Sequence, residues 1–152
     1  MRHYLGAIIC SLLLVPLGCN ARPAPANSFS QVYETTIGPS CTNAYCHYPG
    51  IGLRQGSLDM SSRVVAYWNL VDQPCQGFAC ASQGTRVVPN APGASILFLK
   101  VSQTQPPCGV QMPASVDAIK MPGGNPVFSG NPLTADQQDQ IKSWIADGAQ
   151  ND

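Results

Sequence analysis

The stretch Cys41-Thr-Asn-Ala-Tyr-Cys46-His47 holds two of the seven cysteines and one of the two histidines of this 152-residue chain. The other histidine, His3, lies in a segment with the layout of an export signal, so His47 is the only histidine expected in the mature protein. A Ser-His-Asp triad or a thiol protease would have to use this imidazole, and a zinc site with two histidine ligands cannot form. Hypotheses about the site therefore start from His47 and the two cysteines before it.

The C-x4-C-H spacing is a longer form of the c-type haem attachment signature, which has two residues between its cysteines. In that chemistry two thiols bond to the vinyl groups on one edge of the porphyrin, and a neutral imidazole binds the iron. We therefore expect one covalent haem c, with Cys41 and Cys46 as thioether anchors and His47 as the proximal iron ligand. Two alternatives stay open: a disulfide between Cys41 and Cys46 beside an incidental histidine, or a zinc site completed by other cysteines.

Residues 1–18 are typical of a signal peptide. Arg2 and His3 precede an apolar run over 5–17, which is shorter than the roughly 20 residues of a transmembrane helix. A small residue precedes Cys19, as in lipoprotein signals, so we expect lipidation of Cys19 and a Pro/Ala linker over residues 19–27. The predicted location is the periplasm or cell envelope, with the lipid as membrane anchor; simple secretion is the alternative.

The composition is poor in charge and rich in loop-forming residues. Charged residues make up 11% of the chain, against roughly 25% in an average domain, and there are 14 glycines and 14 prolines. The formal net charge is zero and no run of Lys or Arg occurs, so nucleic acid is not expected as a partner. We expect one domain over residues 28–149.

Apolar residues at helical spacing predict a helix before the C-x4-C-H motif. Asn27 and Ser28 can cap its start, and Gly38-Pro39 is expected to stop it before Cys41. The residues of its buried face are Phe29, Val32, Tyr33, Thr36 and Ile37.

The C-terminal helix carries the strongest local signals. Thr134 and Gln137 make a capping-box pattern, and Gly148 stands where a C-terminal cap belongs. Asp136 and Asp139 lie in the first turns, where the helix dipole favours carboxylates, so we interpret them as solvated stabilisers and not as a catalytic pair. The expected buried face is Ile141, Trp144 and Ile145.

Two further short helices are expected between these ends, one after residues 57–62 and one after Pro92, with Lys100 pointing outward. Only residues 86–88 suggest an extended piece. The chain is thus predicted to be mainly α with long loops. The residues expected to be buried are Val64, Val65, Trp68, Leu70 and Val71 in the first helix and Ile96, Leu97, Leu99 and Val101 in the second.

A series of short segments, in this order, resembles a family of exported bacterial cytochrome c domains. The segments are Leu58-Asp-Met-Ser-Ser62, Val87-Val-Pro89, Ala94-Ser-Ile-Leu-Phe-Leu-Lys100, Pro107-Cys-Gly-Val-Gln-Met-Pro113, Pro132-Leu-Thr134 and Ile141-Lys-Ser-Trp-Ile-Ala-Asp-Gly-Ala149. The resemblance implies a cytochrome c-like helical domain around one haem. It also implies that a methionine before a proline, upstream of the Trp-Ile helix, is the second axial ligand of the iron.

Two methionines meet that description. Met112 matches the Cys-Gly-x-x-Met-Pro string of the family and is preferred, whereas Met121 lies at a more typical distance before the C-terminal helix. Residues 114–120 between them look like an insertion. Met60 is interpreted as core filler.

The remaining cysteines predict one disulfide among Cys75, Cys80 and Cys108, with the pairing left open. Cys75 and Cys80 repeat the x4 spacing, but Ala81 replaces the histidine, so only one haem is expected. A bridge that includes Cys108 would pin the segment leading to Met112.

These observations predict a monohaem c-type cytochrome that exchanges single electrons with an unidentified redox partner outside the cytoplasm, and not an enzyme. One alternative is a haem-free, disulfide-stabilised exported binding domain on the same scaffold. Another is a haem enzyme with an open sixth coordination position.

Overall fold

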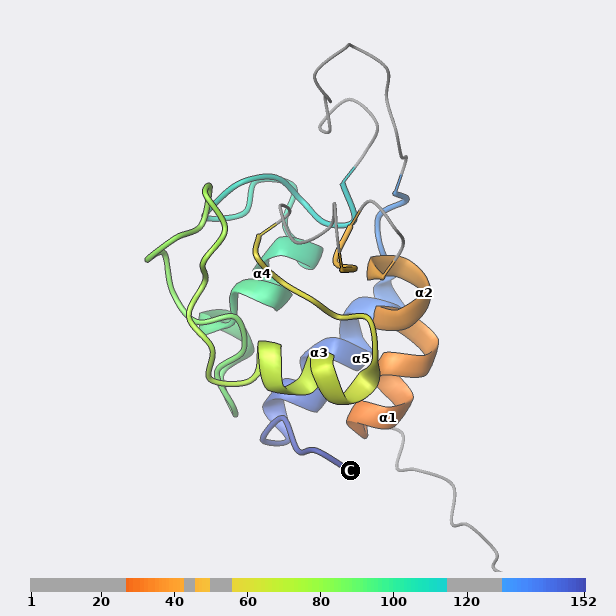
Figure 1. The fold of residues 1–152 in the computed structure, drawn as a ribbon. Helices are drawn as coiled ribbons and strands as arrows, with labels where there is room; N and C mark the ends of the chain where they lie inside the picture. Colours follow the sequence, from red (N-terminus) through yellow and green to blue (C-terminus); the bar gives the residue numbers. More distant parts are fainter. Residues whose placement is uncertain (1–26, 43–45, 50–55, 115–129) are drawn as a thin grey trace, which may run out of the picture.

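The computed structural model describes residues 27–42, 46–49, 56–114 and 130–152 (Figure 1). The predicted signal peptide, the lipidated Cys19, the linker up to residue 26 and Met121 lie outside these ranges. The described chain is mainly helical, as predicted. Its elements are α1 (Phe29–Val32), η1 (Tyr33–Ile37), α2 (Gly38–Cys41), α3 (Arg63–Leu70), η3 (Pro92–Ala94), α4 (Ile96–Ser102) and α5 (Ala135–Ala146).

The N-terminal helix continues through the position where the sequence predicts its end. Ser28 caps α1 as expected, because its side chain accepts from the N–H of Gln31. The helix continues as the π-helical segment η1, which has a wider turn and in which the Gly38 N–H donates to the Tyr33 carbonyl oxygen. It then continues as α2 to Cys41. The expectation that Gly38-Pro39 stops the helix is therefore wrong. A proline fits here because it occupies the first turn of α2, after a wider turn.

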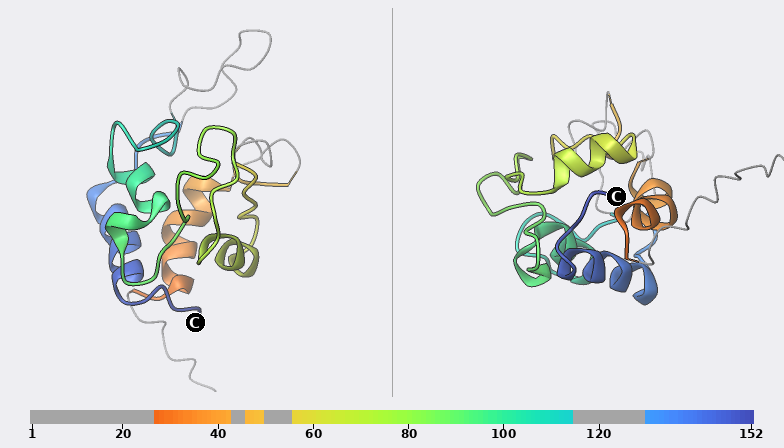
Figure 2. Two further views of the ribbon diagram at one scale, coloured as in Figure 1. Left: turned by 90° about the vertical axis from the view of Figure 1, so that its left-hand side faces the viewer. Right: turned by 90° about the horizontal axis from the view of Figure 1, so that it is seen from below.

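Helix α5 is the centre of the packing. It contacts α1 and α4 (Figure 2), and the predicted face of Ile141, Trp144 and Ile145 is buried. The Trp144 ring lies 4.8 Å from the ring of Phe29, which in turn packs edge-on against Tyr67 of α3. The capping box of Thr134 and Gln137 is present, as predicted.

Helix α3 buries a different face from the one predicted. Ala66 and Leu70 are fully buried, whereas Val64 is 59% and Trp68 65% exposed. The expectation that Val64 and Trp68 are buried is wrong, because α3 covers the core from one side only and turns these two residues to solvent. The Trp68 ring packs edge-on against Tyr67 instead.

Within the described ranges, extended structure is limited to isolated bridges, such as Val71 with Val87 and Thr85 with Ser95. These bridges place residues 85–87 between α3 and α4, close to the short extended piece predicted over 86–88. No helix in these ranges is long and apolar enough to cross a membrane.

Candidate functional site

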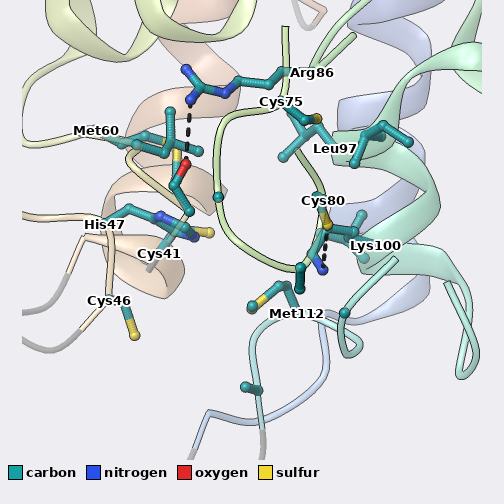
Figure 3. A pocket seen from close by; sticks show the side chains of 18 of the residues that line it. Cys41, Cys46, His47, Met60, Cys75, Cys80, Arg86, Leu97, Lys100 and Met112 are labelled. Carbon is teal, nitrogen blue, oxygen red and sulfur yellow. Dashed lines mark hydrogen bonds between the residues drawn. The ribbon is translucent and has the colours of Figure 1, made fainter. Parts of the chain in front are cut away.

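A cavity of about 420 Å³ brings together the side chains singled out in the sequence. Cys41, Cys46, His47 and Met112 all line it (Figure 3). Most of the remaining lining is apolar, including Leu58, Leu70, Leu97 and Val101. Its size and apolar character are those of a pocket for a small organic molecule or cofactor.

Cys41 reaches the cavity from the last residue of α2. The hydroxyl of Thr42 donates to the Gly38 carbonyl oxygen at 2.6 Å, which caps this helix end. Cys41 is 7% exposed, and burial, followed by the charge of Cys46, raises the pKa of its thiol to about 12. The side chain is therefore a neutral thiol at neutral pH, held against the cavity by the helix.

His47 is fixed to both neighbouring walls through its backbone. Its N–H donates to the Cys41 carbonyl oxygen at 3.0 Å, and its carbonyl oxygen accepts from the Met60 N–H at 2.8 Å. Figure 3 shows the imidazole directed into the cavity, next to Cys41. Gly56 lies beside the ring, since a Cβ at this position would be in ordinary contact with the imidazole Cε1 at 3.8 Å.

Gly56 also meets the opposite loop at very close range. A Cβ on Gly77 would lie 2.3 Å from the Gly56 Cα, which is too short for any side chain. The segment before Leu58 and the loop that contains Cys75 and Cys80 can therefore touch only because position 77 is glycine, while Gly56 itself has a positive φ of 88°, which favours glycine.

Met112 reaches the cavity from the side of α4. Its backbone N–H donates to the Lys100 carbonyl oxygen at 2.8 Å, and Figure 3 shows its thioether directed into the cavity. The segment before it is held twice, by the Cys80–Cys108 disulfide and by the Lys100 ammonium, which donates to the Cys108 carbonyl oxygen at 2.9 Å. The predicted disulfide among the three later cysteines is confirmed, and its pairing is Cys80 with Cys108.

Met60 is 1% exposed and belongs to the main hydrophobic core, in line with its interpretation as filler, although its side chain also borders the cavity. The hydroxyl of Tyr33 donates to its carbonyl oxygen at 3.0 Å. Met121, the alternative ligand in the sequence, lies outside the described residues.

Two cations in the wall were not anticipated. Lys100 was expected to point outward, and that expectation is wrong. It is partly buried and lines the cavity, because its ammonium donates to the Cys108 carbonyl oxygen.

Arg86, the second cation, is 7% exposed and donates to the carbonyl oxygens of Asn69 at 2.7 Å and Ser57 at 3.0 Å. Burial lowers the pKa of both side chains. The sequence feature that could have indicated a buried Arg86 is its position directly before Val87-Val88 in the predicted extended piece.

A scan against protein-family models, a search of curated proteins and a search of solved structures each found no match to this chain. Among the described residues, no three His, Cys, Asp or Glu side chains are grouped so that they could hold a metal ion. The zinc alternative thus has no ligand set in that part of the chain.

Proposed function

We propose that this chain is a monohaem c-type cytochrome, a cytochrome c-like helical domain that carries single electrons outside the cytoplasm. One observation carries the proposal. Met112 is distant in sequence from the C-x4-C-H motif, yet it lines the same cavity as Cys41, Cys46 and His47. Two thiols, one imidazole and one thioether are the groups that covalent attachment and six-coordinate ligation of a haem iron require.

The residues present fit this group. The cavity is mainly apolar, as a macrocycle needs, and both thiols border it beside the imidazole. Cys41 and Cys46 would hold the haem by thioether bonds, and His47 and Met112 would bind its iron. When bound, the haem iron supplies the one-electron change. The thioether of Met112 favours the ferrous state and so a higher reduction potential, which suits electron transfer.

The protein's own part is to hold these groups in place. The hydrogen bond from His47 to Cys41 and the contact of Met112 with α4 restrict the two ligands before any haem is bound. In the same proposal residues 1–18 direct export, Cys19 is the lipid anchor, and a redox protein of the envelope is the partner.

The test is to produce the full chain in a bacterial periplasm that contains a haem-ligation system, and to record its intact mass and visible spectrum. A mass increase of one haem with a six-coordinate low-spin spectrum supports the proposal. Bare polypeptide without Soret absorption would overturn it in favour of a haem-free binding domain. A high-spin spectrum that responds to added ligands would instead indicate an open-site haem enzyme.

A further inference from the structure

Three cysteines outside the proposed haem attachment gather beside the same cavity, and two of them, Cys75 and Cys80, line it. Cys75 and Cys108, each 7% exposed, form a small buried cluster with Ile96, and Cys80 and Leu99 pack against it. Cys80 and Cys108 are bonded to each other, whereas Cys75 is a free thiol. A buried thiol is thus packed in one cluster with a disulfide.

The three sulfurs differ in exposure and in electrostatic surroundings. Cys80 is only partly buried, and the Lys100 ammonium lies 3.9 Å from its sulfur. A cation at this distance stabilises a thiolate on Cys80 and makes it the better leaving group of the bridge. Burial is the largest effect on the Cys75 thiol and raises its pKa, while the charges of Arg86 and Lys100 act in the opposite direction and limit that rise.

We propose that Cys75, Cys80 and Cys108 form an intramolecular thiol–disulfide exchange site, in which the Sγ of Cys75 attacks the Sγ of Cys108 and displaces Cys80. The Cys75–Cys108 bond forms as the Cys80–Cys108 bond breaks. Cys80 leaves as a thiolate beside Lys100 and takes up the proton that Cys75 lost. One disulfide and one thiol are present before and after, so no external oxidant or reductant is consumed.

The exchange changes the wall of the cavity in two ways. It moves the tether of the segment that leads to Met112 from Cys80 to Cys75, and both positions belong to the loop against Gly56. It also turns a buried thiol into a partly exposed one at Cys80, where thiol-modifying reagents can reach it. The site does not depend on bound haem, so it stands or falls separately from the proposed function.

The test follows the disulfide pairing of the folded full chain, with and without haem. Native samples in neutral buffer are exposed to a maleimide for increasing times, quenched, and mapped by mass spectrometry after digestion. Chymotryptic cleavage after Phe78 separates Cys75 from Cys80. We expect Cys80 to become labelled with time, together with peptides linked through Cys75 and Cys108.

Three variants sharpen the test. Cys75→Ser should abolish the labelling of Cys80, and Lys100→Gln should slow it severalfold, whereas Lys100→Arg should keep it because the positive charge remains. The wild-type time course decides the question even where a variant fails to fold.

Persistence of Cys80–Cys108 as the sole bridge, with Cys75 labelled only after denaturation, would overturn the proposal. A bridge between Cys75 and Cys80 would overturn it too, since Cys108 would then be the leaving group.

Discussion

The backbone N–H of Met112 donates to the carbonyl oxygen of Lys100 at 2.8 Å, so the proposed distal ligand is tied to the last turns of α4. The same lysine holds the Cys108 carbonyl oxygen with its ammonium. One residue of α4 thus restrains both ends of the short segment from Cys108 to Met112. The backbone of a methionine on such a restrained segment loses little further conformational freedom when the side chain binds a metal.

Replacing both Cys41 and Cys46 with Ser should abolish covalent haem attachment, because the hydroxyl groups do not form thioether bonds with the vinyl groups. Intact mass and haem-dependent peroxidase staining of denatured protein measure the attachment. Cys75→Ser is the matched control, since Cys75 lines the same cavity outside the motif, and it should keep the haem. Covalent haem in the double variant would contradict the assignment.

Met112→Ala should convert a low-spin haem spectrum to a high-spin one and lower the reduction potential, because the thioether ligand is lost. Met60→Leu is the control within the cavity wall, and Met121→Ala tests the alternative ligand. Visible absorption and potentiometry report on all three. A spin change in Met121→Ala, with Met112→Ala unaffected, would transfer the ligand role to Met121.

Gly77→Ala should destabilise the fold by about 1–3 kcal/mol, because its Cβ would meet the backbone of Gly56 at 2.3 Å. The loop displacement should also reduce haem incorporation beside His47. Gly93→Ala is the matched control, since nothing lies within 4 Å of a Cβ there. Denaturant unfolding compares the two variants, and equal stabilities would refute the close approach.

The haem-free chain should lose stability at alkaline pH through Cys41. Burial raises the pKa of its thiol from 9.0 to about 12, so the folded state holds the proton more tightly than the unfolded state does. This contribution is complete below pH 9.0 and is lost as pH rises towards 12, at about 1.4 kcal/mol per pH unit. Denaturant unfolding across this pH range measures it, and Cys41→Ala should show a shallower decline.

Trp144→Ala should cost about 3–5 kcal/mol, because the ring is 1% exposed and packs against Phe29. Trp68→Ala should change the free energy of unfolding by only about 0.5 kcal/mol, because Trp68 is 65% exposed. Thermal or denaturant unfolding of both variants provides the comparison. A large loss in Trp68→Ala would show that this ring covers more of the core than its exposure indicates.

Features that depend on neighbouring residues were predictable from the sequence. The capping box of Thr134 and Gln137 needs only one turn of helix, and the spacing of Ile141, Trp144 and Ile145 marks their common face. Predictions failed where a distant segment decides exposure or chain direction. Trp68 sits in an apolar pattern, yet none of the elements that the structure describes covers it, and Pro39 follows a π-helical segment that short-range rules do not anticipate.

The sequence by itself determined that Cys46 and His47 stand together, because they are adjacent residues, and that Cys41 lies five residues before Cys46. Only the tertiary structure decided that Met112 lines the same cavity, that Cys108 pairs with Cys80, and that Lys100 points inward to that pair. These relationships join α4 to loops before and after it. They depend on which surfaces α4 and its neighbours bury against each other. The spacing of residues within a short stretch of sequence does not show which surfaces these are.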